Sequence, residues 1–236
     1  MIKKLKFSSR IARSALLVLV LSGRLAAAEP FFEWFGEGEL PGDPATLPQV
    51  VEGDLGTLRE LQFKAGDENP GEATFIAIQP PAGSYTELTI AFFIKPERRN
   101  KNENLVSARG ETDAEGFSLR KTWMKWGLIV GRADAGEKRI NQNRETSLAI
   151  GEWRHIALTF REGKLRFYKD GFLTEEQESP VPALTFSDRE PMRIGAGHGV
   201  FPRVYYGFAG RLAGIYIAPK ALEETEIHGL MKRANP

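Results

Sequence analysis

The sequence predicts an all-β fold, a two-sheet antiparallel jelly-roll sandwich with one short helix at its C-terminal end. Short runs that alternate apolar and polar residues recur from Thr57 onward, and this period of two is typical of strands packed on one face. Turn residues separate the runs, and helical periodicity occurs only over residues 221–233. Many short strands with a single helix indicate two packed sheets.

The first 28 residues predict a secretory signal peptide. Lys and Arg residues precede an apolar run over residues 15–21, and three alanines follow and end at Ala28. This order is that of an export signal, with cleavage expected after Ala28. The apolar run is shorter than the roughly 20 residues of a membrane-spanning helix, so we expect no membrane insertion. The sequence therefore predicts a secreted or periplasmic protein with one domain over residues 29–236.

Removal of the signal peptide changes the net charge of the chain. The whole chain has a formal net charge of +1. Since residues 1–28 hold six Lys and Arg and no acid, the remainder has 26 basic against 31 acidic residues, a net charge of about −5. Nucleic acid and anionic membranes bind concentrated basic faces, so we expect neither as a partner. The chain has no cysteine, which excludes disulfides and thiolate metal sites.

Residues 29–56 predict a short first strand followed by an irregular connection rich in Gly and Pro. An aromatic cluster stands at the head of this segment, and we expect it to dock on the body of the domain, because a solvated linker has no use for large aromatic side chains. The cluster consists of Phe31, Phe32, Trp34 and Phe35.

The remaining elements follow in order along the chain. Strands are expected over residues 73–79, 86–95, 153–160, 164–170 and 208–217. Residues 153–160 and 164–169 form an expected hairpin, because Arg161-Glu162-Gly163 joins two alternating runs as a turn. The polar residues 131–146 are expected to form a solvated loop. Residues 221–233 predict a helix, with acids in its first turn and bases in its last.

Several segments, taken in order, carry a family resemblance. They are LQFKAG (61–66), TELTIAFFIKP (86–96), GEWRHIALTF with GKLRFYKDG (151–171), MRIG (192–195) and FAGRLAGIYI (208–217). This series resembles the laminin G-like, concanavalin A-like jelly-roll domains, roughly over residues 57–230. The resemblance implies the fold of the lectin and glucanase superfamily. Members commonly carry an acidic pair in the closing strand, where this chain has Ala213 and Gly214.

The segment GETDAEG (110–116) is the candidate catalytic motif, because it places Glu111, Asp113 and Glu115 at alternate positions. A retaining polysaccharide hydrolase needs two carboxyl groups roughly 5–5.5 Å apart on a rigid support. The resemblance instead implies that this segment is a loop between two strands, over residues 105–107 and 117–119. We therefore expect no enzymatic activity, and a retaining hydrolase that uses these three carboxylates remains the alternative.

Aromatic side chains near polar or loop positions are the candidate ligand-binding residues, because sugar rings stack on exposed Trp and Tyr faces. The candidates are Trp123, Trp126, Tyr205 and Tyr206. Adjacent tyrosines on a strand point to opposite faces, so one of the two tyrosines is expected in the core.

No cofactor is required by any motif in the sequence. Asp67, Glu68 and Asn69 offer several oxygens in one loop, and oxygen ligands converging at one place are what Ca²⁺ needs. The three histidines, His155, His198 and His228, are scattered over an expected strand, a loop and the helix, with no zinc-binding spacing.

The sequence favours an exported, non-catalytic binding module that recognises a glycan or an extracytoplasmic protein. An envelope scaffold or protein-interaction domain is the alternative besides the hydrolase. Jelly rolls host lectins, glucanases and adhesion modules alike, so the ligand has to be identified from a site.

Overall fold

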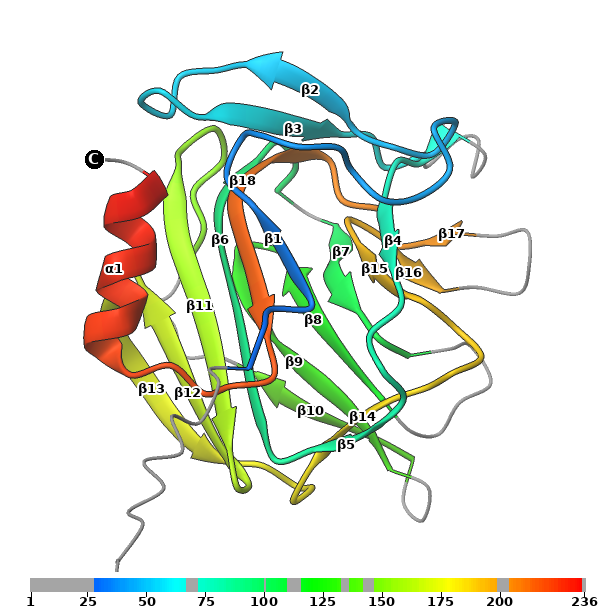
Figure 1. Cartoon of the computed structure of the whole chain (residues 1–236), viewed down its shortest axis with the longest axis vertical. Helices are drawn as coiled ribbons and strands as arrows, with labels where there is room; N and C mark the ends of the chain where they lie inside the picture. The colour runs from blue at the N-terminus through cyan, green and yellow to red at the C-terminus, as the bar shows by residue number, and fades with distance from the viewer. Residues whose placement is uncertain are drawn as a thin grey trace, which may run out of the picture.

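The computed structural model describes residues 28–66, 72–99, 101–109, 116–132, 136–141, 147–198 and 204–234. These residues form two antiparallel sheets packed face to face, with the helix α1 (Glu224–Ala234) on the outer side of the larger sheet (Figure 1). The predicted all-β sandwich with a C-terminal helix is therefore confirmed. No helix among the described residues is long and apolar enough to span a bilayer.

The larger sheet, sheet A, has eight strands. Its order is β13-β12-β11-β6-β18-β3-β2, and β1 also pairs with β18. The strands are β1 (Phe32–Trp34), β2 (Gln49–Glu52), β3 (Arg59–Phe63), β6 (Glu87–Pro96), β11 (Arg154–Arg161), β12 (Lys164–Lys169), β13 (Phe172–Glu178) and β18 (Gly210–Ala218). The predicted hairpin is β11 with β12, in register from Ile156↔Lys169 to Arg161↔Lys164.

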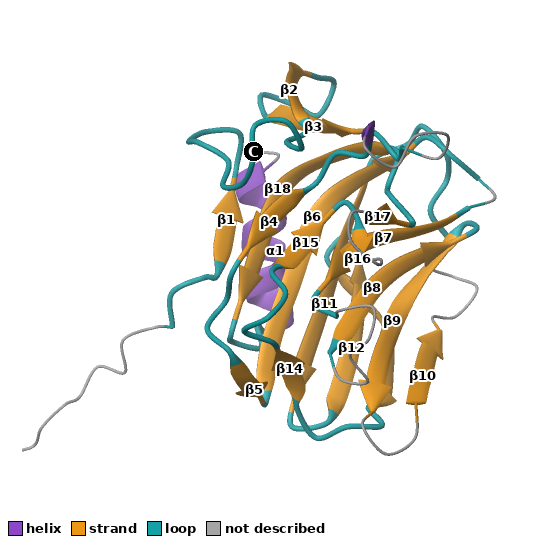
Figure 2. Ribbon diagram, turned by 90° about the vertical axis from the view of Figure 1, so that its right-hand side faces the viewer, coloured by secondary structure: helices purple, strands orange, loops and turns teal. Residues whose placement is uncertain are grey.

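The smaller sheet, sheet B, has six strands in the order β10-β9-β8-β7-β15-β4. They are β4 (Ile76–Ile78), β7 (Asn102–Ser107), β8 (Phe117–Thr122), β9 (Lys125–Arg132), β10 (Gly136–Asn141) and β15 (Met192–Ile194). Two small two-stranded sheets join β5 (Gly83–Tyr85) to β14 (Leu184–Phe186), and β16 (Gly197–His198) to β17 (Val204–Tyr205). Sheet B and α1 lie on opposite sides of sheet A (Figure 2).

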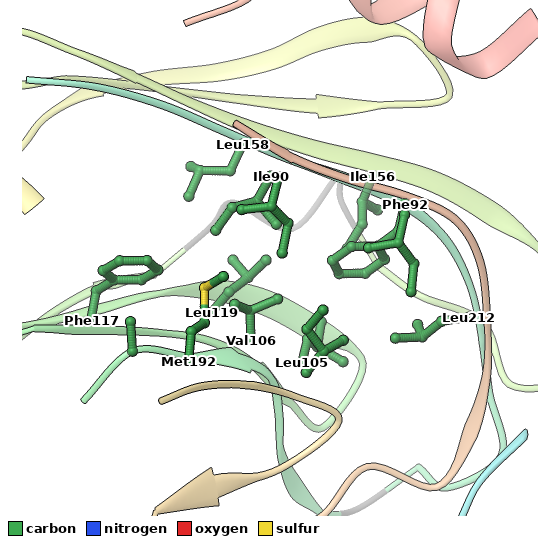
Figure 3. Close-up of a cluster of buried hydrophobic side chains, with 14 of the residues drawn as sticks. Ile90, Phe92, Leu105, Val106, Phe117, Leu119, Ile156, Leu158, Met192 and Leu212 are labelled. Atoms are coloured by element: carbon green, nitrogen blue, oxygen red, sulfur yellow. The ribbon is translucent and has the colours of Figure 1, made fainter. Parts of the chain in front are cut away.

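The hydrophobic core fills the space between the inner faces of the two sheets. Apolar side chains from sheet A meet those of sheet B there, and burial of this apolar surface is the main stabilising contribution. Each of the labelled side chains in Figure 3 is at most 1 % exposed: Ile90, Phe92, Ile156, Leu158 and Leu212 from sheet A, and Leu105, Val106, Phe117, Leu119 and Met192 from sheet B.

The aromatic head of the domain docks on the sandwich, as the sequence predicts. Phe32 and Trp34 on β1 are buried in the core cluster, and β1 pairs with β18 through Phe32↔Ile217 and Trp34↔Ile215. Phe31 packs edge-on against Tyr85, with ring centroids 5.2 Å apart. This head therefore covers one end of the core.

The expectation of a solvated loop over residues 131–146 is wrong in part. Residues Gly136–Asn141 form β10, which pairs with β9 and ends sheet B. Charged residues are common on edge strands, where they discourage pairing with a further chain. The polar composition that indicates a loop is therefore also that of an edge strand.

Gly195 lies where a side chain cannot fit. Its φ is +91°, and an added Cβ would stand 2.3 Å from the ring of Phe63, which is 1 % exposed. Its backbone joins two neighbouring segments, because its N–H donates to the carbonyl of Leu105 and its carbonyl accepts from Phe208. Gly195 therefore holds the backbone of Phe208, two residues after Tyr206, through this second hydrogen bond.

We expect Gly195→Ala to lower the free energy of unfolding by about 2–3 kcal/mol, from left-handed strain and overpacking. Gly229→Ala is the matched control, because a Cβ there meets nothing within 4 Å, and it should stabilise α1 by about 0.5–1 kcal/mol. Chemical denaturation measures both. Equal stability of the two variants would contradict this account of Gly195.

Candidate ligand-binding site

The aromatic residues predicted to bind ligand differ in exposure. Trp123 is 63 % exposed and Tyr206 is 46 % exposed, whereas Trp126 is 1 % exposed. Trp126 lies on β9 across from Lys121, and its ring packs edge-on against Phe167 of sheet A with centroids 5.4 Å apart. The prediction that Trp126 binds ligand is therefore wrong, because the period of β9 places its ring inside the sandwich.

Trp123 occupies the turn between β8 and β9. Thr122 pairs with Lys125, so Trp123 and Met124 form a two-residue turn. The φ of Trp123 is +62°, and Met124 is not among the residues with positive φ. This pattern matches a type II′ turn, in which the first position prefers glycine. The N–H of Trp123 donates to the carbonyl of Lys101 at 3.4 Å, which ties the turn to the start of β7.

Tyr206 lies beside the same end of sheet B. Its carbonyl accepts a hydrogen bond from the N–H of Asn104 on β7 at 2.7 Å. The guanidinium of Arg120 on β8 stacks over its ring, 4.6 Å from the centroid, and Arg120 Nε donates to Asn104 Oδ1 at 3.0 Å. Arg120 is three residues from Trp123, about 10 Å along an extended chain. We call Trp123, Arg120 and Tyr206 the Trp123–Tyr206 site.

The expectation that one of the two tyrosines lies in the core stays a prediction, because only Tyr206 has a described side chain. Tyr205 ends β17, and its side chain lies outside the described residues. Tyr206 leaves the strand with a φ of +50°. Because β17 ends at Tyr205, the period of two does not assign a face to Tyr206, whose side chain is exposed.

Four non-glycine residues have positive φ in the described part of the chain: Trp123, Glu162, Asp170 and Tyr206. Glu162 and Asp170 each precede a glycine in a hairpin turn, which explains their conformation. Trp123 also lies in a hairpin turn that requires positive φ, but that position favours glycine, and Tyr206 follows β17 outside any such turn. The left-handed conformation costs each of these two residues about 1 kcal/mol or more. Such strain clusters at ligand-binding sites, which favours a binding role for Trp123 and Tyr206.

A buried ion cluster supports the site from inside the sandwich. Glu103 on β7 and Lys121 on β8 are both 0 % exposed, and their Oε2 and Nζ atoms are 2.6 Å apart. Glu103 Oε1 accepts from Arg98 Nε at 2.8 Å and from the N–H of Ala209 at 3.1 Å. Burial lowers the pKa of Lys121, and the Glu103 carboxylate opposes this effect. These contacts thus connect Arg98, which precedes β7, and Ala209, which precedes β18, to Glu103 on β7 and Lys121 on β8.

Two predicted sites lie outside the described residues. Glu111, Asp113 and Glu115 of the candidate catalytic motif belong to one gap, between β7 and β8, and the calcium candidates Asp67, Glu68 and Asn69 belong to another. Both stay predictions. Among the described residues, no group of three or more His, Asp or Glu side chains could hold a metal ion.

A cavity of about 260 Å³ lies on the outer side of sheet A, beside the start of α1. It is lined by Thr159, Arg161, Glu162, Lys164, Arg166, Ala221 and Leu222. Its two arginines are already paired, because Arg161 and Arg166 both lie within 4 Å of Glu223, and Arg166 also pairs with Glu176. The ion pairs with Glu223 hold the residue before α1 against the sheet, so we assign the cavity a structural role.

The structure brings together two histidines that the sequence places on separate elements. His155 on β11 is 1 % exposed, and its Nδ1 has no hydrogen-bond partner. Its ring packs against Phe93 at 4.9 Å. Burial, and secondly the nearby His228 of α1, lower the pKa of His155 to about 4. The two histidines therefore lie between α1 and sheet A.

Sequence reasoning missed Arg120 and Asn104. Arg120 stands next to Leu119, which faces the core, so alternation along β8 places it on the outer face. Its position three residues before an exposed tryptophan could have identified it. No sequence signal indicates that Tyr206, 86 residues later, stacks on it.

Comparison with family models places residues 70–228 under a laminin G-type model described as the concanavalin A-like lectin/glucanases superfamily. No curated protein matches the chain in sequence.

Solved structures share the fold at low identity. The binding domain of Paraclostridial mosquitocidal protein 1 has 17% identity and a TM-score of 0.61, over 85% of this chain and 51% of that one. The binding domain of botulinum neurotoxin serotype G has 12% identity and a TM-score of 0.60, over 86% and 50%. Domain 4 of AbnA, an extracellular arabinanase from Geobacillus stearothermophilus, in complex with arabinotriose, has 16% identity and a TM-score of 0.58, over 83% and 88%. The chain therefore spans about half the length of the first two, and these structures, two of them named as binding domains, fit a binding module.

Proposed function

The chain belongs to the concanavalin A-like lectin/glucanases superfamily, and from this premise we propose that it is a non-catalytic module that binds a glycan at the Trp123–Tyr206 site. The observation that carries the proposal is the pair of solvent-exposed aromatic rings at residues with positive φ, at one end of sheet B. The turn at Trp123 favours glycine rather than tryptophan, and core packing does not account for either exposed ring.

Binding would combine stacking with hydrogen bonds. The face of the Trp123 indole would pack against a sugar ring, since the C–H-rich face of a sugar is apolar and the indole is the largest aromatic surface in proteins. Arg120, which is held by the Tyr206 ring and by Asn104, would donate to hydroxyl oxygens. The buried Glu103–Lys121 pair would keep β7 and β8 in place, so that little conformational entropy is lost on binding.

We also propose that the protein is exported, with residues 1–28 removed and residues 29–236 forming the binding module. The basic, apolar and small residues of the N-terminal segment support this proposal. Mass spectrometry of the protein recovered outside the cytoplasm would test it. A mature N-terminus at Glu29 is expected, and an intact Met1 on the exported protein would contradict it.

The first test is a glycan array probed with residues 29–236, with and without a calcium chelator. We expect a specific glycan to bind. Loss of binding in chelator would place calcium at the site, as the Asp67 segment predicts. Specific capture of an exported protein without any glycan binding would overturn the proposal in favour of the protein-interaction alternative.

The same array hits should be tested for hydrolysis. We expect no turnover of any bound polysaccharide. Turnover that disappears in Glu111→Gln would instead establish the retaining hydrolase, in which Asp113 and Glu115 complete the carboxylate set.

Trp123→Gly is expected to weaken glycan binding at least about tenfold, or 1.4 kcal/mol, while leaving the free energy of unfolding unchanged or higher. Glycine removes the stacking surface and relieves the left-handed strain at this position. Phe172→Ala is the matched control, because Phe172 is also 63 % exposed but lies on β13 of sheet A. Calorimetric titration and denaturation measure the two effects. Full binding by Trp123→Gly would exclude the site.

A further inference from the structure

We infer that α1 is released from the outer face of sheet A in mildly acidic solution, while the β-sandwich stays folded. This inference is independent of the proposed glycan-binding function. The observation that carries it is the burial of His155, which is 1 % exposed beneath α1. Its ring has a nitrogen without a hydrogen-bond partner and lies close to a second histidine, His228, on the helix itself.

Two apolar clusters join α1 to the outer face of sheet A. In the first, Ile227 packs with Ala157 of β11. In the second, Met231 packs with Phe93 of β6. His155 lies between the clusters, because its ring contacts Phe93 at 4.9 Å and it shares one face of β11 with Ala157, two residues along the strand. The helix therefore covers the imidazole of His155.

α1 can leave the sheet without breaking a strand pair, because it follows β18, the last strand of the described chain. Few polar ties hold it in place. Before the helix, the N–H of Leu222 donates to Thr89 Oγ1 at 2.9 Å, and in its last turn Arg233 pairs with Glu33 at 2.6 Å. Segments near the chain ends that are held by few contacts open locally before the protein unfolds globally.

The charged groups of sheet A and its loops are occupied elsewhere. Asp170, in the turn after β12, accepts from the backbone N–H of His155 rather than from its ring, and its other carboxylate oxygen lies 3.9 Å from Arg154. On β6, Lys95 pairs with Asp54 at 2.6 Å. No carboxylate among these residues therefore accepts a hydrogen bond from the ring of His155.

The groups of α1 and β12 do not stabilise a charged ring either. The charged side chains one helical turn from His228, Glu224 and Lys232, are exposed and opposite in sign. Burial raises the pKa of Tyr168 on β12, so its hydroxyl stays neutral. Burial, and secondly His228, lower the pKa of His155 to about 4. The imidazole is therefore neutral while α1 is in place.

Release of α1 is thereby coupled to protonation of His155. In water the pKa of the ring returns to its ordinary value of 6.5, against about 4 beneath the helix. The released form therefore binds a proton first as the pH falls, so the contribution of neutral His155 to docking is fully present above about pH 6.5 and is lost between there and about pH 4. The equilibrium constant for release should rise about 20-fold from pH 7 to pH 5, and about 100-fold from pH 7 to pH 4.

Amide hydrogen exchange at pH 7 and pH 5, corrected for the intrinsic exchange rate at each pH, tests the release. We expect the amides of α1 to be less protected than those of β6 at both pH values, and the protection of α1 to fall about 20-fold between them. Equal protection of α1 and β6 at both pH values would show that α1 leaves only when the protein unfolds, and would overturn the inference. Protection of α1 that does not change with pH would also overturn it.

Two histidine variants test which group controls the release. His155→Leu removes the titrating group beneath α1 and should abolish the fall in α1 protection. His228→Gln is the matched control, because it removes only the smaller of the two causes that lower the pKa of His155, and it should retain most of the fall. A fall that is equal in the two variants, or larger in His155→Leu, would contradict the role of His155.

An NMR titration of the imidazole signals gives a check that needs no substitution. In the unsubstituted protein the ring of His155 should titrate at a pKa of about 4. Titration of His155 near the ordinary histidine value, about 6.5, would mean that α1 does not hold the ring neutral, and would overturn the inference.

Discussion

Replacing Glu103 by leucine is expected to lower the free energy of unfolding by about 3–5 kcal/mol. The change leaves the ammonium of Lys121, which is 0 % exposed, without its carboxylate partner. It also removes the acceptor of Arg98 and of the Ala209 N–H. An uncompensated buried charge costs several kcal/mol because the low-dielectric interior cannot replace its hydration.

A second variant separates the buried charge from other effects of the substitution. Glu103→Leu combined with Lys121→Met should recover most of the lost stability, since no unpaired charge then remains in the core and Arg98 can reach solvent. Glu97→Leu is the matched control at an exposed acid and should change stability by no more than about 0.5 kcal/mol. Urea denaturation measures all three. A Glu103→Leu variant as stable as Glu97→Leu would contradict the assigned role of the ion cluster.

Acidification from pH 7 to pH 4 is expected to remove about 3 kcal/mol of stability through His155 alone. The folded protein holds the pKa of His155 at about 4, against an ordinary histidine value of 6.5, chiefly because burial disfavours the charged ring. The unfolded chain therefore binds a proton first as the pH falls, so this stability is fully present above about pH 6.5 and is lost between there and about pH 4. Asp54, whose pKa is lowered to about 2 by hydrogen bonds from Lys95 and Trp153, acts only below this window.

His155→Leu should remove this part of the pH dependence, because leucine fills the site between Phe93 and α1 without a titratable group. The environment of His155 also holds His228 and Asp170, whose Oδ1 accepts a hydrogen bond from the backbone N–H of His155. The free energy of unfolding, measured at several pH values between 7 and 4, gives the slope for both proteins. The same slope in His155→Leu and the unsubstituted protein would contradict the assignment.

The fold could be predicted from local patterns because the pairing of its central strands follows the alternation of apolar residues. Ile156, Leu158 and Phe160 face the core from β11, as their period of two indicates, and Asp170-Gly171 forms the next turn with positive φ at both residues. The strand β10 was predicted as a loop because it lies at the edge of sheet B, where polar residues are common and the apolar alternation of a core strand is not required. At Gly214, φ is +56° where the register of β18 shifts, so its glycine reflects backbone geometry.

The site could be predicted only in part. Trp123 and Trp126 are three residues apart in the same polar stretch, yet the first is exposed and the second is buried. This difference depends on where the turn ends and β9 begins, at Lys125. A period of two cannot assign faces until that boundary is known. The stacking of Tyr206 on Arg120 and the buried Glu103–Lys121 pair are long-range contacts. A single sequence contains no signal for such pairs.

The most direct test of the Trp123–Tyr206 site is an NMR titration that follows the four tryptophan indole N–H groups while an oligosaccharide identified on the glycan array is added. Trp34 and Trp126 are 2 % and 1 % exposed, and Trp153 Nε1 donates to Asp54, so these three serve as internal references. The account predicts that the Trp123 indole signal shifts in a saturable manner while the Trp34 and Trp126 signals stay in place. Saturable binding that leaves the Trp123 signal unchanged would contradict it.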